Sequence, residues 1–173
     1  MKTALVFFLL AFSTAAQEKT VPPWLSACGP SDVKFDVNKF QTKSPAEPQP
    51  SKALVYVVED TGHSEKECLL GCITVRVGLD GAWVGANQGT TQFSFSVEPG
   101  EHHLCANWQS KLGRLSAIHS LANFTAEPGK VYYFRTRVWA GDKVPFLDLD
   151  PVNSDQGRYL VATSSLALSH AKK

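Results

Sequence analysis

The chain has 173 residues, of which 43% are hydrophobic and 19% are charged. This length fits about one domain, and the composition supplies a core while excluding a disordered chain or a coiled coil. The formal charge of +1 falls to zero when Lys2 leaves with the leader described next, so the chain has no strong field for nucleic acid or an anionic membrane, and we expect neither as a partner.

Residues 1–16 have the three parts of a secretory signal peptide. Lys2 provides a positive start, residues 4–12 form an unbroken apolar run, and small side chains precede an expected cut before Gln17. An apolar run of this length reaches only about half of the hydrocarbon core of a bilayer. We therefore expect a periplasmic or secreted protein with no integral membrane segment once the leader is removed.

Residues 17–51 are predicted to form an N-terminal arm and a proline-rich linker. Val33, Phe35 and Val37 alternate with polar residues, which indicates a short strand or an arm packed on the body. Residues 42–51 carry three prolines, which remove backbone donors and favour an extended chain, so this stretch is interpreted as the linker.

Four cysteines follow the leader, and an even number in an exported chain predicts two disulfides. Three pairings are possible from the sequence. We favour Cys68 with Cys72, which lie four residues apart on a short helical turn, and Cys28 with Cys105. The second bond closes a long loop and is worth on the order of 4 kcal/mol. A redox-active pair at Cys68 and Cys72 is the less favoured alternative, because the spacing is not Cys-x-x-Cys.

From residue 52 onward, apolar side chains repeat every second residue, which is the period of a β-strand. Residues 53–58 form a short run rich in β-branched side chains, and residues 73–79 alternate strictly. The dipeptide Asp80-Gly81 then predicts a two-residue hairpin, since both residues tolerate the positive φ angles of a type I′ turn.

Two further turns carry the same dipeptide, Pro99-Gly100 and Pro128-Gly129. Proline presets φ at the second turn position and glycine accepts a positive φ at the third, so both are predicted to be type II turns that close hairpins. The strands expected beside these turns cover residues 93–97, 102–108 and 131–139.

Residues 146–152 predict a last strand, and Asn153 is placed to cap a short helix that runs to residue 162. Residues 163–173 are expected to be a flexible tail. The fold class predicted from these elements is all-β: an antiparallel β-sandwich of about 7–8 strands over residues 52–162, with a short C-terminal helix.

Several of these turn and strand motifs occur in an order that resembles a known family. They are Ala53–Val57, Leu79–Gly81, Val97–His102, Glu127–Phe134 and Leu149–Val152 with Gly157–Leu160. The chain resembles, over about residues 52–162, an uncharacterised family of exported bacterial domains of unknown function. The stretch from Asp80-Gly81 to His102 also resembles the PEGA-type β-domain, a non-catalytic module of cell-surface proteins. The resemblance implies an exported bacterial β-domain and provides no catalytic residues to transfer.

The candidate binding residues are Tyr133, Arg135, Arg137 and Trp139, which share one face of the strand at residues 131–139 because alternate residues point the same way. Exposed aromatic side chains on a sheet can stack on sugars or anchor a protein partner, although any one of them can instead fill the core. We predict that this mixed aromatic and arginine face contacts an envelope protein or glycan.

An enzymatic function is the alternative interpretation. The sequence has no nucleophile elbow, P-loop or dinucleotide fingerprint, which leaves His102, His103, Asp148 and Asp150 for a hydrolase-like site assembled from distant loops. The two histidines are neighbours on a strand and point to opposite faces, so we expect no metal site and no cofactor. The function predicted from the sequence is a non-catalytic binding or structural module at the cell envelope.

Overall fold

The computed structural model of the chain describes residues 26–41, 45–61, 73–139 and 145–172. The expected signal peptide, together with Cys68 and Cys72, lies outside the described residues. Trp139 is described as part of a strand, without its side chain. No helix in the described segments is both long enough and apolar enough to cross a membrane.

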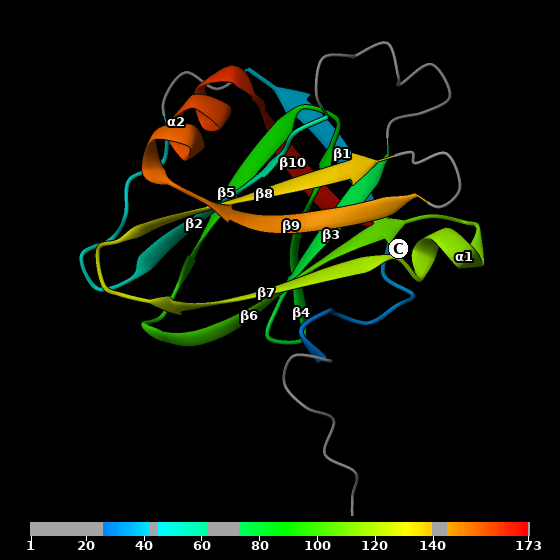
Figure 1. Cartoon of the computed structure of the whole chain (residues 1–173), viewed down its shortest axis with the longest axis horizontal. Coiled ribbons are helices and arrows are strands. Elements are labelled where there is room, and N and C mark those ends of the chain that lie inside the picture. The colour runs from blue at the N-terminus through cyan, green and yellow to red at the C-terminus, as the bar shows by residue number, and fades with distance from the viewer. Residues whose placement is uncertain (1–25, 42–44, 62–72, 140–144, 173) are drawn as a thin grey trace, which may run out of the picture.

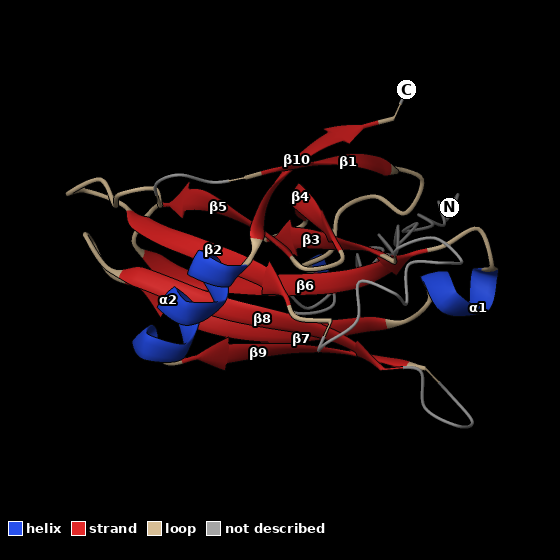
Figure 2. Cartoon of the chain, turned by 90° about the horizontal axis from the view of Figure 1, so that it is seen from above, coloured by secondary structure: helices blue, strands red, loops and turns tan. Residues whose placement is uncertain are grey.

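The described residues form ten strands in two sheets, which pack against each other as the layers of a sandwich (Figure 1). The strands of sheet A are, in spatial order, β1 (Phe35–Phe40), β10 (Ser165–Ala171), β5 (Thr91–Val97), β2 (Ala53–Glu59), β8 (Val131–Trp139) and β9 (Phe146–Val152). The strands of sheet B are β4 (Ala82–Gln88), β3 (Thr74–Leu79), β6 (Gly100–Gln109) and β7 (His119–Ala126). The helices α1 (Gly113–Ser116) and α2 (Ser154–Thr163) lie at opposite ends of the molecule (Figure 2).

The hydrophobic core lies between the two sheets. Val57 and Phe134 contribute to it from sheet A, and Val75, Val77 and Leu104 contribute from sheet B. These side chains occupy alternate positions along their strands, as the two-residue period predicts. The mainly β fold with two layers and a short C-terminal helix is therefore confirmed.

The expectation of a purely antiparallel sandwich with 7–8 strands is wrong. Strand β2 runs parallel to β8, and β10 runs parallel to β5, so sheet A is mixed. Sheet B is antiparallel throughout. Alternation of apolar residues has the same period in both kinds of pairing, so the pattern alone does not distinguish them.

The two ends of the described chain pair with each other, which differs from the expected flexible tail at residues 163–173. Strand β10 lies antiparallel to β1, in register from Phe35 opposite Ala171 to Phe40 opposite Leu166. Alternation at Phe35 and Val37 indicates a short strand at β1, whereas β10 has mostly small and polar side chains and shows no clear buried pattern before its partner is known. The sandwich consequently includes parts of the predicted arm and tail as well as residues 52–162.

The three predicted turns have different outcomes. Asp80 and Gly81 have φ angles of +49° and +91° and close the β3–β4 hairpin, as expected. The two Pro-Gly turns also end in glycines of positive φ, but neither closes a hairpin. Each carries the chain from one sheet to the other, from β5 to β6 and from β7 to β8. A turn fixes the local reversal of the chain, whereas the sheet that the next strand joins depends on long-range packing.

The N-terminal arm, residues 26–34, is attached to the outer face of sheet B. Cys28 forms the favoured disulfide with Cys105, with 5.1 Å between their Cα atoms. Trp83 donates its indole N–H to the carbonyl oxygen of Pro30 over 2.8 Å. The buried guanidinium of Arg76 lies over the Trp83 ring and donates to the carbonyl oxygen of Ser31. The arm is thus part of the folded body.

Helix α2 covers part of the outer face of sheet A. It begins as expected after Asn153, whose side chain accepts a hydrogen bond from the backbone N–H of Gln156 over 2.9 Å. Gly157 packs on the ring of Tyr133 so closely that a Cβ atom there would lie 2.2 Å from Cγ of the tyrosine. Tyr133 in turn stacks on Tyr56, with ring centroids 5.5 Å apart. The absence of a side chain at residue 157 allows this close contact.

Gly157→Ala should therefore destabilise the protein by about 1–3 kcal/mol, because the added methyl group displaces α2 or the tyrosine ring. Urea unfolding of both proteins measures this difference as a lower midpoint for the variant. Gly113→Ala is the matched control, since no heavy atom lies within 4 Å of a Cβ added there. Equal losses of stability in the two variants would show that α2 does not depend on this contact.

Candidate functional site

Three of the four predicted binding residues of β8, those with described side chains, lie on the expected face of the strand. Phe134 and Thr136 point inward and are buried, whereas Tyr133, Arg135 and Arg137 are on the outer face of sheet A. The Tyr133 ring lies beneath α2, in close contact with Gly157. The structure places these residues on one strand, and their role in binding stays a prediction.

Both arginines of this face have carboxylate partners. Arg135 Nη1 lies 3.8 Å from Asp60 Oδ2, and Arg137 Nη2 lies 3.2 Å from Asp150 Oδ2 and 3.6 Å from Asp148 Oδ2. All five side chains are partly exposed, so the individual pairs add little to stability. The pairs do bear on function, because Asp148 and Asp150, the two aspartates considered for acid–base chemistry, both form ion pairs with Arg137.

His102 is held between two acceptors. Its Nδ1 lies 2.6 Å from Asp80 Oδ2, and its Nε2 lies 2.8 Å from the carbonyl oxygen of Glu98. Only the protonated ring can donate to both. Partial burial acts to lower the pKa of His102, but the hydrogen bonds to Asp80 and Glu98 and the charge of Asp80 outweigh it, so the pKa is raised above its usual value. His102 therefore fastens the β3–β4 turn to the connection between β5 and β6.

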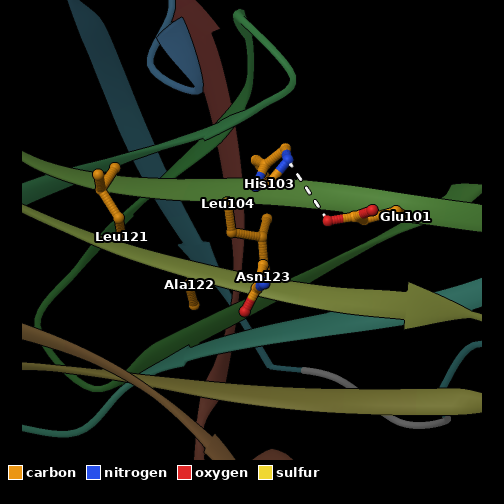
Figure 3. Close-up of a pocket in the computed structure, with 6 residues that line it drawn as sticks. All are labelled: Glu101, His103, Leu104, Leu121, Ala122 and Asn123. Carbon is orange, nitrogen blue, oxygen red and sulfur yellow. Dashed lines mark ion pairs between the residues drawn. The ribbon is translucent and has the colours of Figure 1, made fainter. Parts of the chain in front are cut away.

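His103 points to the other face of β6, as expected for a neighbouring residue on a strand. Its Nε2 lies 3.8 Å from Glu101 Oε1, and both side chains line a shallow pocket of about 450 Å³ together with Leu121 and Asn123 of β7 (Figure 3). Within the described part of the chain, no group of three or more His, Cys, Asp or Glu residues is arranged to hold a metal ion.

A more polar cavity, of about 350 Å³, lies between α2 and the adjoining ends of β2 and β5. We call it the α2 cavity. Its lining residues come from three separate segments of the chain: Glu59 and Asp60 at the end of β2, Thr90 before β5, and Gln156, Tyr159, Leu160, Thr163 and Ser164 in and after α2. It thus gathers carboxyl, hydroxyl, amide and aromatic groups that are far apart in the sequence.

Glu59 is the most unusual residue of the α2 cavity, because it is only 1% exposed. Alternation along β2 places its side chain on the inner face with Val57, opposite Thr136 of β8. Burial raises the pKa of the Glu59 carboxyl well above its usual value, and the hydrogen bond from the backbone N–H of Gly89 and the charge of Lys39 offset this only in part. Its Oε2 atom is buried without a hydrogen-bond partner.

The sequence prediction missed Glu59. The available signal was its position at the end of the apolar run from Ala53 to Val58, where alternation places an acidic residue on the same face as Val55 and Val57. The contribution of α2 to the cavity had no such signal, because it depends on where the helix packs.

One further unpartnered polar atom belongs to the lining of the α2 cavity, Ser164 Oγ, and two others lie on sheet A outside that lining. Gln92 Oε1, Arg135 Nε and Ser164 Oγ are each buried without a hydrogen-bond partner. Arg135 and Gln92 both face Val58 across neighbouring strands, one from β8 and the other from β5. Native structures leave few buried polar atoms unpaired, so the two that belong to lining residues, Glu59 Oε2 and Ser164 Oγ, single out this cavity.

Comparisons with protein families, with curated proteins and with solved structures find no match for this chain. The resemblance to exported bacterial β-domains stays a prediction that depends on the turn and strand motifs.

Glu59→Gln should change the pH dependence of stability. A carboxyl whose folded pKa is raised contributes stability that is fully present below its unfolded pKa of about 4.5 and is lost as the pH rises through the folded pKa. The variant cannot ionise at this position, so its free energy of unfolding relative to the wild type should rise with pH. Near pH 8 the variant should be the more stable protein, by about 1–3 kcal/mol, and should have the higher thermal midpoint.

Thermal unfolding from pH 4 to pH 9 measures this effect. Glu127→Gln, at an exposed turn, is the control and should follow the wild type at every pH. A constant difference between Glu59→Gln and the wild type across this range would contradict a buried, neutral carboxyl.

His102→Gln should be less stable than the wild type, and the difference in stability should be largest at acidic pH. The raised pKa means that His102 contributes stability below its unfolded pKa of about 6.5, and this contribution is lost as the pH rises through the folded pKa. The variant should be less stable by about 1 kcal/mol near pH 5.5, with a smaller difference near pH 9. Chemical denaturation at the two pH values is the measurement, with the exposed His119→Gln as control. A difference that grows toward alkaline pH would contradict the paired imidazolium.

Proposed function

We propose that this protein is an exported, non-catalytic β-sandwich that binds an envelope protein or glycan, and that the α2 cavity is its binding site. The cavity carries the proposal, because it is concave and brings together polar groups from three segments beside an aromatic ring. Small-molecule sites commonly combine a concave surface with a few convergent polar groups. Tyr159 is 68% exposed on α2 and is available to a ligand.

The positions of the candidate acid–base residues support binding over catalysis. His102 and His103 lie on β6 of sheet B, whereas Asp148 and Asp150 lie on β9 of sheet A and face Arg137. General acid–base catalysis requires the acid and base to converge on one substrate position. A hydrolase-like site built from these four residues is therefore the less favoured function.

Export is supported by two independent features. The leader at residues 1–16 has the composition of a signal peptide, and the Cys28–Cys105 disulfide is typical of an oxidising compartment. The motif resemblance to exported bacterial β-domains agrees with this proposal.

The test is to express the whole chain with its leader, purify the exported product and incubate it with envelope saccharides and peptides. We expect the exported protein to begin at Gln17, which would show that the leader is removed. We also expect it to retain a ligand whose mass is unchanged, which would show binding without cleavage. Tyr159→Ala should reduce retention several-fold, because the exposed ring lines the cavity. Phe146→Ala removes a 47% exposed aromatic ring outside the lining of the cavity and is the matched control.

Two outcomes would contradict the proposal. Cleavage of a ligand by the wild type would favour the enzymatic alternative. Equal retention by the wild type and Tyr159→Ala would place binding elsewhere on the molecule.

A further inference from the structure

The charge of the α2 cavity restricts the ligands that it suits. Among the described residues that line it, none is Lys, Arg or His, and two are acidic. An anionic ligand therefore finds no cationic side chain in this lining. One of the two carboxylates, Asp60, already faces the guanidinium of Arg135 at 3.8 Å, and the other, Glu59, is buried. A cationic ligand thus has no exposed and uncommitted carboxylate to pair with in this lining.

The unpartnered atoms beside the cavity have mixed hydrogen-bonding character. Arg135 Nε is only a donor, Gln92 Oε1 is only an acceptor, and the Ser164 hydroxyl is both. Ser164 belongs to the cavity lining, whereas Arg135 and Gln92 lie outside the lining, opposite Val58 on the neighbouring strands. An ammonium group can only donate and a carboxylate can only accept, whereas a hydroxyl group does both. The neutral polar groups of the lining itself, the Thr163 and Ser164 hydroxyls and the Gln156 amide, also both donate and accept, so they match a ligand that carries several hydroxyl groups.

Tyr159 adds an apolar surface to these polar groups. Its ring is exposed on α2, one residue before the partly covered cavity residue Leu160. Thr163 donates its hydroxyl hydrogen within the helix, to the carbonyl oxygen of Tyr159 over 2.9 Å, so its oxygen remains an acceptor toward the cavity. A sugar ring has C–H groups on its faces and hydroxyl groups around its edge, which is the same combination of apolar face and polar rim.

We infer that the α2 cavity binds a small neutral saccharide, with a sugar face stacked on Tyr159 and its hydroxyl groups directed toward Ser164, Gln156 and Thr163. The inference rests on the proposed binding function and names its ligand class. The cavity volume of about 350 Å³ is at the small end of the range for small-molecule sites, so it suits a short saccharide.

Isothermal titration calorimetry of the mature protein tests this inference with matched probes. Glucose, N-acetylglucosamine and maltose are neutral, glucosamine is cationic and glucuronic acid is anionic at pH 6, where the titration is carried out. We expect at least one neutral probe to bind more tightly than both charged ones. Tyr159→Ala should weaken that binding on the order of tenfold, and Tyr159→Phe should preserve it, because the ring remains.

Ser164→Ala distinguishes a ligand contact from a structural role. The hydroxyl has no partner in the protein, so its removal should leave the thermal midpoint unchanged while weakening saccharide binding several-fold. Phe146→Ala should leave saccharide binding unchanged, because Phe146 is outside the lining of the cavity.

The two proposals fail in different ways. Preferential binding of glucosamine or of a peptide, with loss in Tyr159→Ala, would overturn the saccharide and keep the binding function at this cavity. Saccharide binding that is indifferent to both Tyr159→Ala and Ser164→Ala would overturn this site. Hydrolysis of maltose by the wild type would overturn the non-catalytic function itself.

Discussion

Each strand of a two-layer sandwich buries only one of its faces, and this constraint organises the whole molecule. The inner faces meet in a core to which Val57, Val77, Leu104 and Phe134 contribute. The outer faces then require cover wherever they carry large or apolar side chains. This chain provides the cover from segments outside the central strands, with the arm on sheet B and α2 on sheet A. The surfaces available to a ligand lie where these covers end.

The two covers are attached by different physical means. On sheet B, the arm is held by a covalent bond at Cys28 and by polar contacts of Arg76 and Trp83 with its backbone. On sheet A, α2 is held by close packing, because Gly157 lets the helix backbone lie directly on the Tyr133 ring. The same contact positions the C-terminal half of α2 beside the ends of β2 and β5 and so forms the wall of the α2 cavity.

Several charges of the described residues are arranged in local pairs. Arg137 faces two aspartates on sheet A, and His102 faces Asp80 at the other layer. Glu59 differs, since burial favours its neutral form and its pKa is raised. Paired charges on separate faces suit a scaffold that keeps its shape, whereas catalysis would need such groups to meet at one position. This distribution agrees with a binding function centred on neutral polar groups.

The sequence by itself determined the features that depend on local geometry. Alternation identified the strands and the opposite faces of Tyr133 and Phe134, Asp80-Gly81 determined the hairpin, and Asn153 determined the start of α2. Tertiary structure alone decided the parallel pairing of β2 with β8, the change of sheet after each Pro-Gly turn, and the pairing of β1 with β10. It also decided the α2 cavity around Glu59. A residue pattern indicates the face of a strand on which a side chain lies. The residues that the side chain contacts depend on packing between segments that are distant in the chain.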